Sequence, residues 1–208
     1  MSTFRFAIMG AGNIAHQFCD AVTLVEDCEV SAIASKDLGR AQKFAEECSV
    51  AHAYDNYEQM LIEEKPDCVY IAVTPNDHFR LTMLCLEHRV PVLCEKAMFT
   101  NSAEAKAVFE KAEKDQTFVM EAMWSRFLPA VNQAKKWAAE GKIGRLEALQ
   151  GRIGFLAPEG ADNRYHSPLL CGGAATDITV YAYEIATWLV NEPVRKTYAA
   201  ANLSLIHI

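Results

Sequence analysis

The sequence predicts an α/β protein in which a doubly wound parallel sheet is followed by an incomplete α+β domain. Over about the first 120 residues, short apolar runs alternate with segments of helical periodicity. Runs that are apolar throughout are typical of strands buried on both faces of a parallel sheet, and each parallel crossover needs a helix. The pattern changes after Met123, so we expect a first domain over residues 1–123 and a second over residues 124–208.

Six runs in the first domain are interpreted as strands, because they are short, apolar and bounded by polar or turn-forming residues. The expected strands are Phe4–Met9, Val30–Ala34, Ala51–Tyr54, Cys68–Val73, Pro91–Cys94 and Thr117–Met123. Between them, apolar residues recur every three or four positions, which indicates helices. The expected helices cover about residues 14–22, 37–47, 57–63, 79–87 and 105–112.

The second domain shows a looser pattern, in which a polar loop with Pro158, Gly160 and Pro168 interrupts the regular elements. The expected elements are the helix Pro129–Glu140, the strand Leu146–Phe155, the helix Ala174–Val190 and the strand Val194–Ala201. Two helices and two strands are too few to form a closed layer of secondary structure. We therefore expect a C-terminally truncated domain whose last residues, 203–208, are not native sequence.

Composition argues against several classes of function. The 208-residue chain carries a formal net charge of -7, whereas nucleic-acid binding needs clustered Lys and Arg. No apolar run approaches the ~20 residues of a membrane helix, and because strand-like sequence begins at once we expect no signal peptide. The seven cysteines are scattered and lack a CxxC pair, which favours reduced thiols in the cytoplasm. Because no His, Cys or Asp cluster has ligand spacing, we expect no metal, and we expect neither a nucleic-acid nor a membrane partner.

A glycine-rich turn, Gly10-Ala11-Gly12-Asn13-Ile14-Ala15, separates the first expected strand from the first helix. This GxGxxA spacing is the dinucleotide fingerprint of a Rossmann domain. Gly10 permits the tight turn, Gly12 lets a pyrophosphate approach the backbone, and Ala15 lets helix and strand pack closely. The diphosphate would then meet N–H groups at the helix N-terminus. The alternative is a Rossmann turn that binds no cofactor.

The end of the second expected strand bears on the choice between NAD and NADP. An NAD enzyme usually has Asp or Glu there, which accepts hydrogen bonds from the ribose hydroxyls. Here Ser35 occupies that place, Lys36 follows it, and Arg40 lies one turn further on. A hydroxyl and two cations suit a 2′-phosphate, which a carboxylate would repel, so we favour NADP over NAD. Asp37 could still turn inward, and Lys36 and Arg40 could be solvated residues at a helix start.

Three further segments resemble the glucose–fructose oxidoreductase and inositol dehydrogenase (Gfo/Idh/MocA) family. The segments are Cys94-Glu95-Lys96-Ala97 with Asn101 shortly after, Glu121–Phe127, and Gly172–Tyr181. They are similar to the family's CEKP…N motif, to EAxWTRF and to GGGALLDIGVY. The nearest branch is that of dimeric dihydrodiol dehydrogenase and D-xylose dehydrogenase. Ala97 departs from the family's Pro, Cys171 from the first Gly of a triplet, and Thr179 from a helix Gly.

The resemblance implies catalytic roles for Lys96, Tyr181 and Asp177. Oxidation of an alcohol needs a base for the hydroxyl proton while hydride leaves for nicotinamide C4. A tyrosine has a reference pKa near ~10, and a nearby ammonium favours the phenolate. Asp177 and Tyr181 share a face of one expected helix, where Asp177 could orient Lys96 or a substrate hydroxyl. Taken alone, these residues could instead be a core tyrosine, a surface lysine and a capping or locally paired aspartate.

The glycine turn, the second strand and the resemblance together indicate the residues that contact the cofactor and the substrate. The cofactor residues are Gly10, Gly12, Asn13, Ile14, Ser35, Lys36, Arg40, Thr74, Asn76, His78, Glu95 and Lys96. The substrate residues are Trp124, Arg126 and Phe155. Aromatic residues mostly pack in cores, which is the alternative for Trp124 and Phe155. His78 could equally be a structural hydrogen-bonding group.

The sequence therefore predicts an NADP-dependent oxidoreductase that transfers hydride between the nicotinamide and the carbinol carbon of a sugar or a trans-dihydrodiol. Tyr181 would be the acid/base, assisted by Lys96. The resemblance implies a homodimer for the full-length protein. The alternative is a dinucleotide-binding fragment or module without catalysis, because the substrate pocket of a truncated domain lacks a wall.

Overall fold

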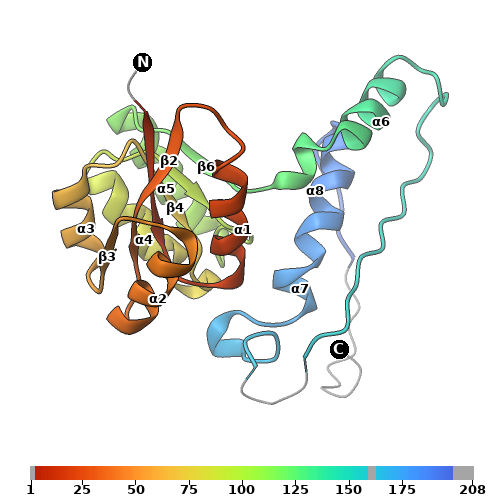
Figure 1. The fold of residues 1–208 in the computed structure, drawn as a ribbon. Coiled ribbons are helices and arrows are strands. Elements are labelled where there is room, and N and C mark those ends of the chain that lie inside the picture. The colour runs from red at the N-terminus through yellow and green to blue at the C-terminus, as the bar shows by residue number, and fades with distance from the viewer. Residues whose placement is uncertain (1–2, 159–162, 199–208) are drawn as a thin grey trace. The chain divides into compact units, whose positions relative to one another are not determined.

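The computed structural model describes residues 3–158 and 163–198 (Figure 1). The chain divides into two compact units, residues 1–122 and residues 123–208. Within the described residues, no helix is both long enough and apolar enough to span a bilayer.

The first unit is a doubly wound α/β domain built on six parallel strands. Their order across the sheet is β3-β2-β1-β4-β5-β6, so the chain starts in the middle, moves to one edge and then crosses to the other. The strands are β1 (Phe4–Met9), β2 (Cys28–Ala34), β3 (His52–Tyr54), β4 (Cys68–Ile71), β5 (Val92–Cys94) and β6 (Val119–Glu121). The expected fold class is confirmed, and each expected strand of this unit is present with small shifts at its ends.

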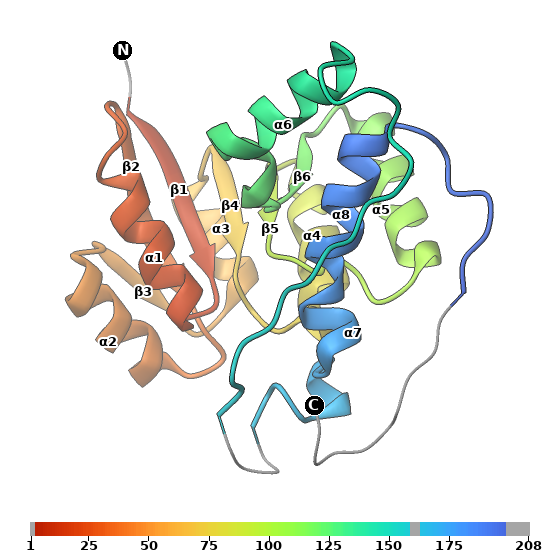
Figure 2. The ribbon, with the colours of Figure 1, turned by 90° about the vertical axis from the view of Figure 1, so that its right-hand side faces the viewer.

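Helices connect successive strands and cover both faces of the sheet (Figure 2). They are α1 (Asn13–Val22), α2 (Leu38–Cys48), α3 (Tyr57–Glu64), α4 (Pro75–Glu87) and α5 (Ser102–Asp115). Asp37, Asn56 and Asn101 each cap a helix by accepting a backbone N–H from its first turn. α4 begins earlier than expected, because Pro75 occupies its first turn, where a proline sacrifices no helical hydrogen bond.

The two faces of the sheet bury separate apolar cores. On one face, Ile8 and Ile33 pack with Ala15 of α1 and Phe44 of α2. On the other face, Met9 belongs to a cluster that includes residues of α3 and α4. All of β4 is buried, which explains why its sequence is apolar without alternation. The core thus supports the strand ends from both sides.

The second unit contains helices joined by irregular segments. Its helical elements are the 3-10 turn Trp124–Phe127, α6 (Pro129–Ala139), the 3-10 turn Pro168–Leu170, α7 (Ala174–Asp177) and α8 (Thr179–Val190). The expected helix Pro129–Glu140 is confirmed, with Glu140 as its C-cap. The expected helix Ala174–Val190 is instead two helices separated at Ile178. The Thr179 hydroxyl donates to the Ala174 carbonyl there, a side-chain bond that competes with the backbone ladder.

The expected strand Leu146–Phe155 is wrong, and so is the described part, residues 194–198, of the expected strand Val194–Ala201. Residues 146–155 have no regular secondary structure, and neither have residues 193–198. A strand needs a neighbour to satisfy its backbone N–H and C=O groups, and the described residues of this unit include no other strand. Residues 199–201 of the second expected strand, the loop residue Gly160, and residues 203–208 lie outside the described residues.

Candidate functional site

The predicted cofactor residues of the first unit follow the carboxyl ends of parallel strands. Residues just beyond three of these strands donate backbone N–H groups to the last residue of a neighbouring strand. The pairs are Gly10 to Ala34 at 2.8 Å, Ala72 to Met9 at 2.8 Å, and Glu95 to Ile71 at 2.9 Å. Adjacent β1 and β4 lead to helices on opposite faces, which is the topological switch point where open α/β sheets bind ligands.

The geometry of the glycine turn fits a dinucleotide. Gly10 has φ +110°, and a Cβ there would lie 2.8 Å from the carbonyl carbon and oxygen of Ala72, so only glycine fits. Gly12 is the N-cap of α1, and a Cβ there would meet nothing closer than the Ala72 oxygen at 3.8 Å. Among the described residues, no side chain caps the first turn of α1 and no acid lies in it. The exposed Asn13 and Ile14 open this turn, whose N–H groups can bind an anion.

Arg40 reaches from α2 to the glycine turn, where its Nη2 donates to the Ala11 carbonyl at 3.3 Å. Asp37 accepts the Arg40 backbone N–H at 2.8 Å, so its carboxylate is engaged as a helix cap. Ser35 is buried, and its Oγ accepts the Asp37 N–H at 3.4 Å. Of these residues, Arg40 brings a cation to the turn, whereas Ser35 and Asp37 stabilise the local backbone.

Lys36 is paired with an acid from another segment. Its Nζ lies 2.5 Å from Asp77 Oδ2, and Asp77 Oδ1 lies 3.6 Å from Arg80 Nε. Burial alone would raise the pKa of Asp77, but the hydrogen bonds and charges of Lys36 and Arg80 lower it overall. Asp77 lies in the first turn of α4, together with the exposed Asn76, and Thr74 is the N-cap of that helix. The structure therefore brings Lys36 beside the turn that contains Thr74 and Asn76.

His78 lies inside the first unit with none of its surface exposed. Its Nδ1 lies 3.0 Å from the Ala97 oxygen and 3.2 Å from the Met98 oxygen, and its Nε2 lies 3.1 Å from the Val73 oxygen. The ring thus links the turn after β4 to the loop that carries Lys96, whose peptide bond to Ala97 is cis. These contacts favour the structural interpretation of His78 over direct contact with a cofactor.

Replacement of His78 by leucine is expected to lower the free energy of unfolding by about 1–3 kcal/mol, because a neutral imidazole carries one N–H and a buried carbonyl that loses this donor costs about that much. Equilibrium unfolding in urea measures this loss. The same substitution at His88, whose Nε2 pairs with Glu58 at 3.2 Å near the surface, should stay within about 0.5 kcal/mol of wild type. Equal losses in the two variants would contradict the structural role.

The stability of the first unit should also depend on pH through His78. Burial lowers the pKa of His78 below its usual 6.5, and the three carbonyl contacts oppose this shift. Between the lowered value and 6.5 the unfolded chain binds more protons than the folded chain, so stability should fall as the pH drops through this window. A His78→Leu variant should show a flatter dependence in urea titrations at successive pH values.

The loop after β5 is held near both of its ends. Glu95 is buried; its Oε1 accepts the Tyr70 hydroxyl at 2.6 Å, and its Oε2 accepts the Lys96 backbone N–H at 3.1 Å. Burial raises the pKa of Glu95, although both hydrogen bonds oppose the shift. Beyond Lys96, Met98 donates its backbone N–H to Glu121 at 2.9 Å. The backbone around Lys96 is therefore fixed by two carboxylates.

Asp177 and Tyr181 lie in the second unit, on either side of the break at Ile178. Asp177 ends α7, and its Oδ1 lies 3.8 Å from Arg164 Nη1. Tyr181 lies in the first turn of α8, and its hydroxyl oxygen accepts the indole N–H of Trp124 at 3.1 Å. The expectation that Asp177 and Tyr181 share one helix is wrong, because Ile178 separates the two helices.

Arg126 and Phe155, which were predicted on the substrate side, make contacts within the second unit. Arg126 Nε lies 2.5 Å from Glu184 Oε1, and its guanidinium carbon lies 4.5 Å from the centre of the Trp188 ring. Phe155 meets Tyr165 edge-on, with the ring centres 5.2 Å apart. Both residues thus have structural contacts, and their role toward a substrate stays a prediction.

Sequence reasoning missed three polar residues that organise these segments. Tyr70 and Glu121 hold the Lys96 loop, and Glu184 holds Arg126. The available signal is a polar group inside an apolar element: Tyr70 in a buried strand and Glu184 in an apolar helix. Such groups are buried only when they have partners, but spacing along the chain does not name the partner.

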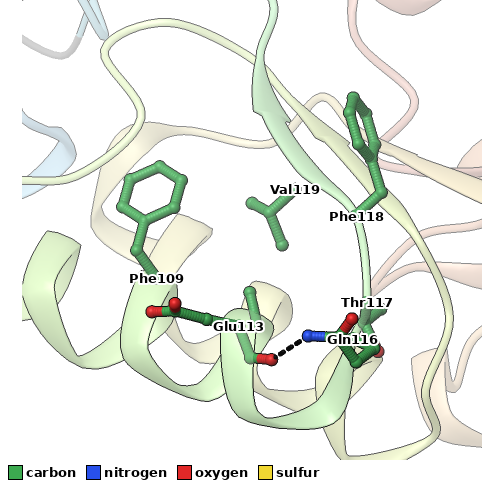
Figure 3. A pocket seen from close by; sticks show the side chains of 7 residues that line it. Phe109, Glu113, Gln116, Thr117, Phe118 and Val119 are labelled. Carbon is green, nitrogen blue, oxygen red and sulfur yellow. Dashed lines mark hydrogen bonds between the residues drawn. The ribbon is translucent and has the colours of Figure 1, made fainter.

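A hollow of about 440 Å³ lies between the end of α5 and the start of β6 (Figure 3). Phe109 and Val119 contribute to its lining, and Gln116 donates to the Glu113 carbonyl at 2.7 Å on its rim. The hollow lies at the amino end of β6, whereas the glycine turn and the Lys96 loop follow the carboxyl ends of strands. We therefore do not assign it to the cofactor site.

Comparison with known proteins identifies the family of both units. Residues 4–123 match the Gfo/Idh/MocA oxidoreductase family with its NAD-binding Rossmann fold. Residues 131–206 match the Gfo/Idh/MocA C-terminal domain.

Curated relatives include trans-1,2-dihydrobenzene-1,2-diol dehydrogenases. The chain is 32% identical to that of Mus musculus over 190 residues, and 34% identical to that of Sus scrofa over 185 residues. These matches cover 89% and 86% of the chain, but 56% and 54% of the two relatives. The chain thus spans about half the length of the curated relatives it matches.

Solved structures show the same fold. An NAD-binding protein from Listeria innocua has a TM-score of 0.81 at 22% identity, over 91% of this chain and 56% of that one. Scyllo-inositol dehydrogenase from Lactobacillus casei, with bound NAD(H) and scyllo-inositol, has a TM-score of 0.73 at 15% identity, over 90% and 56%. From the glycine turn to α8, the chain belongs to the Gfo/Idh/MocA family of oxidoreductases.

Proposed function

We propose that the protein is an NADP-dependent oxidoreductase that transfers hydride between the nicotinamide and the carbinol carbon of a sugar or a trans-dihydrodiol. The observation that carries the proposal is that the glycine turn and the Lys96 loop lie at the same carboxyl edge of the sheet, on either side of β4. The Lys96 amine at these strand ends can take part in a reaction of a dinucleotide whose diphosphate binds the N-terminus of α1. The names of the relatives support a diol or a cyclic polyol as the substrate class.

The proposed chemistry divides the work among three residues. When bound, the nicotinamide supplies the hydride acceptor. Tyr181 takes the proton of the substrate hydroxyl as hydride leaves the carbon that carries this hydroxyl. In the reverse direction Tyr181 returns the proton. The Lys96 ammonium stabilises the phenolate form of Tyr181 that accepts this proton, and Asp177 orients Lys96 or a substrate hydroxyl. The proposal requires Lys96 and Tyr181 to act on one substrate.

A preference for NADP over NAD is part of the proposal. Arg40 already donates to the glycine turn, so its guanidinium is near the path of a bound dinucleotide. Asp37 Oδ1 is engaged as a helix cap, which supports the proposal that this carboxylate does not bind the ribose as an NAD enzyme's acid would. Lys36 adds a second cation, which forms an ion pair with Asp77. Arg40 is thus the main candidate for binding a 2′-phosphate.

Replacement of Arg40 by alanine is expected to weaken NADPH binding about 10- to 100-fold and to change NADH binding by about twofold or less, because a charge-assisted hydrogen bond contributes about 1.5–3 kcal/mol. Cofactor fluorescence titrations measure both affinities. Lys43→Ala is the matched control, since Lys43 lies on the same helix and pairs with Glu47 at the surface. If Arg40→Ala weakens both cofactors equally, Arg40 does not contact the 2′-phosphate.

The activity itself is tested with a panel of sugars and trans-diols, each offered with NADP and with NAD. Absorbance of the reduced nicotinamide reports turnover. We expect at least one diol or sugar to be oxidised, and faster with NADP than with NAD. NADPH binding without turnover of any alcohol would favour a dinucleotide-binding module instead.

A further inference from the structure

Three consecutive residues of the second unit attach the 3-10 turn Trp124–Phe127 to α8. Trp124 donates its indole N–H to the Tyr181 hydroxyl at 3.1 Å. Ser125 donates its hydroxyl to Glu184 Oε2 at 2.9 Å, and Arg126 Nε lies 2.5 Å from Glu184 Oε1. Tyr181 and Glu184 are three positions apart on α8, so they lie on neighbouring parts of one helix face. The turn is thus bound to the face of α8 that carries the predicted acid/base.

Glu184 anchors this contact. Its side chain is only 8% exposed, and both of its carboxylate oxygens have partners. A buried carboxylate is stable only when it is paired in this way, and its removal leaves the partners unsatisfied. Arg126 is held further by the Trp188 ring, which its guanidinium carbon approaches to 4.5 Å. Because its two following residues bind Glu184, the backbone at Trp124 is held beside α8, while its side chain is about half exposed.

The contact between Trp124 and Tyr181 fixes the phenol oxygen. The two rings cross at 65° with their centres 5.9 Å apart, an edge-to-face arrangement that restricts both ring planes. An indole N–H donates but cannot accept, so the phenol oxygen accepts in this pair and its own proton points elsewhere. A neighbour of this kind holds the oxygen of an acid/base group without competing for the proton that it transfers.

We propose that Glu184 and Trp124 are positioning residues for Tyr181: Glu184 fixes the turn to α8, and the Trp124 indole N–H fixes the phenol oxygen. This inference rests on the proposed function of Tyr181 as the acid/base. It gives Trp124 a role different from the substrate contact that the sequence predicts. It also explains why a carboxylate is buried in an otherwise apolar helix.

The indole N–H resonances test the contact without any turnover. The chain has three tryptophans, so three Trp→Phe variants assign the three indole signals in the isotope-labelled protein. Tyr181→Phe is expected to shift the Trp124 signal and to leave that of Trp137, on α6, unchanged. Glu184→Gln, which keeps the shape and one acceptor oxygen, should shift the Trp124 signal less than Glu184→Ala. An unmoved Trp124 signal in Tyr181→Phe would overturn the proposal.

The kinetics of Trp124→Phe test the positioning role. This substitution keeps an aromatic ring and removes the N–H, so we expect kcat to fall about 5- to 10-fold, as the loss of a hydrogen bond of about 1 kcal/mol implies, with KM for the alcohol nearly unchanged. Trp137→Phe is the matched control, and its kcat and KM should equal those of the wild type. A higher KM at unchanged kcat would assign Trp124 to the substrate and overturn the proposal.

The failure of this inference can be told apart from the failure of the proposed function. A wild-type protein that oxidises no alcohol contradicts the proposed function, whereas the indole signals still decide whether Trp124 and Glu184 hold Tyr181. If Glu184→Ala does not fold, Glu184→Gln alone tests whether Glu184 holds the turn that carries Trp124. A Glu184→Gln protein with the wild-type Trp124 signal and wild-type kcat would show that the carboxylate is not needed to fix the turn.

Discussion

Replacement of Tyr181 by phenylalanine is expected to lower kcat by about a thousandfold, because general acid–base groups contribute roughly 10²–10⁴ to the rate. The change removes the hydroxyl alone. The ring stays, and with it the edge-to-face packing against Trp124. Affinity for NADPH should therefore remain within about twofold of wild type, since the predicted dinucleotide residues belong to the first unit. Steady-state kinetics and cofactor titrations measure the two quantities separately.

Tyr183→Phe is the matched control for this experiment. Tyr183 lies on the same helix as Tyr181 and is 60% exposed. The loss of its hydroxyl should leave kcat and KM unchanged. A Tyr181→Phe protein that keeps more than about a tenth of the wild-type kcat would mean that another group transfers the proton.

Replacement of Gly10 by alanine should destabilise the first unit by about 3–5 kcal/mol. A left-handed φ costs a non-glycine residue about 1–3 kcal/mol, and a clash in a packed interior costs about as much again. Gly10 has φ +110°, and its new Cβ would lie 2.8 Å from backbone atoms of Ala72, which are themselves held by the bond to Met9. Because domains are stable by only about 5–15 kcal/mol, urea unfolding should show a large shift in midpoint.

Gly12→Ala distinguishes the steric role of Gly10 in the turn from the role of Gly12, which is to let a pyrophosphate approach the backbone. The added Cβ would meet only the Ala72 oxygen at 3.8 Å, and Gly12 has an ordinary φ of -100°, so stability should change by about 1 kcal/mol or less. NADPH affinity should nevertheless fall, because the methyl group occupies the place where a pyrophosphate approaches the backbone. Comparable losses of stability in Gly10→Ala and Gly12→Ala would contradict the steric difference between the two positions.

The first unit could be predicted from the sequence because its physics is local and repetitive. An apolar run such as Cys68–Ile71 indicates a strand buried on both faces, and parallel strands need the intervening helices. Errors were confined to element ends, for example at Pro75, which extends α4 beyond its apolar repeat. The second unit was harder to predict, because a strand over residues 146–155 depends on a partner strand that the run itself does not specify.

In the candidate site, too, some residues could be predicted from the sequence and others could not. The glycine turn and Lys96 were recognisable because backbone geometry and motif spacing constrain them locally. The partner of Lys36 is Asp77, 41 residues away, and the partner of Arg126 is Glu184, 58 residues away. Such pairs arise from tertiary packing, so periodicity and spacing along the chain do not predict them.

Because Gly10, Ala72 and Glu95 are bound to neighbouring strands through their own amides, we expect the backbone at these strand ends to move together with the sheet. Amides held in this manner exchange with deuterium at rates set by the opening of the whole sheet rather than by the fluctuation of a loop. A ligand arriving there meets a preorganised backbone. The conformational entropy lost on association is therefore smaller than a mobile loop would lose.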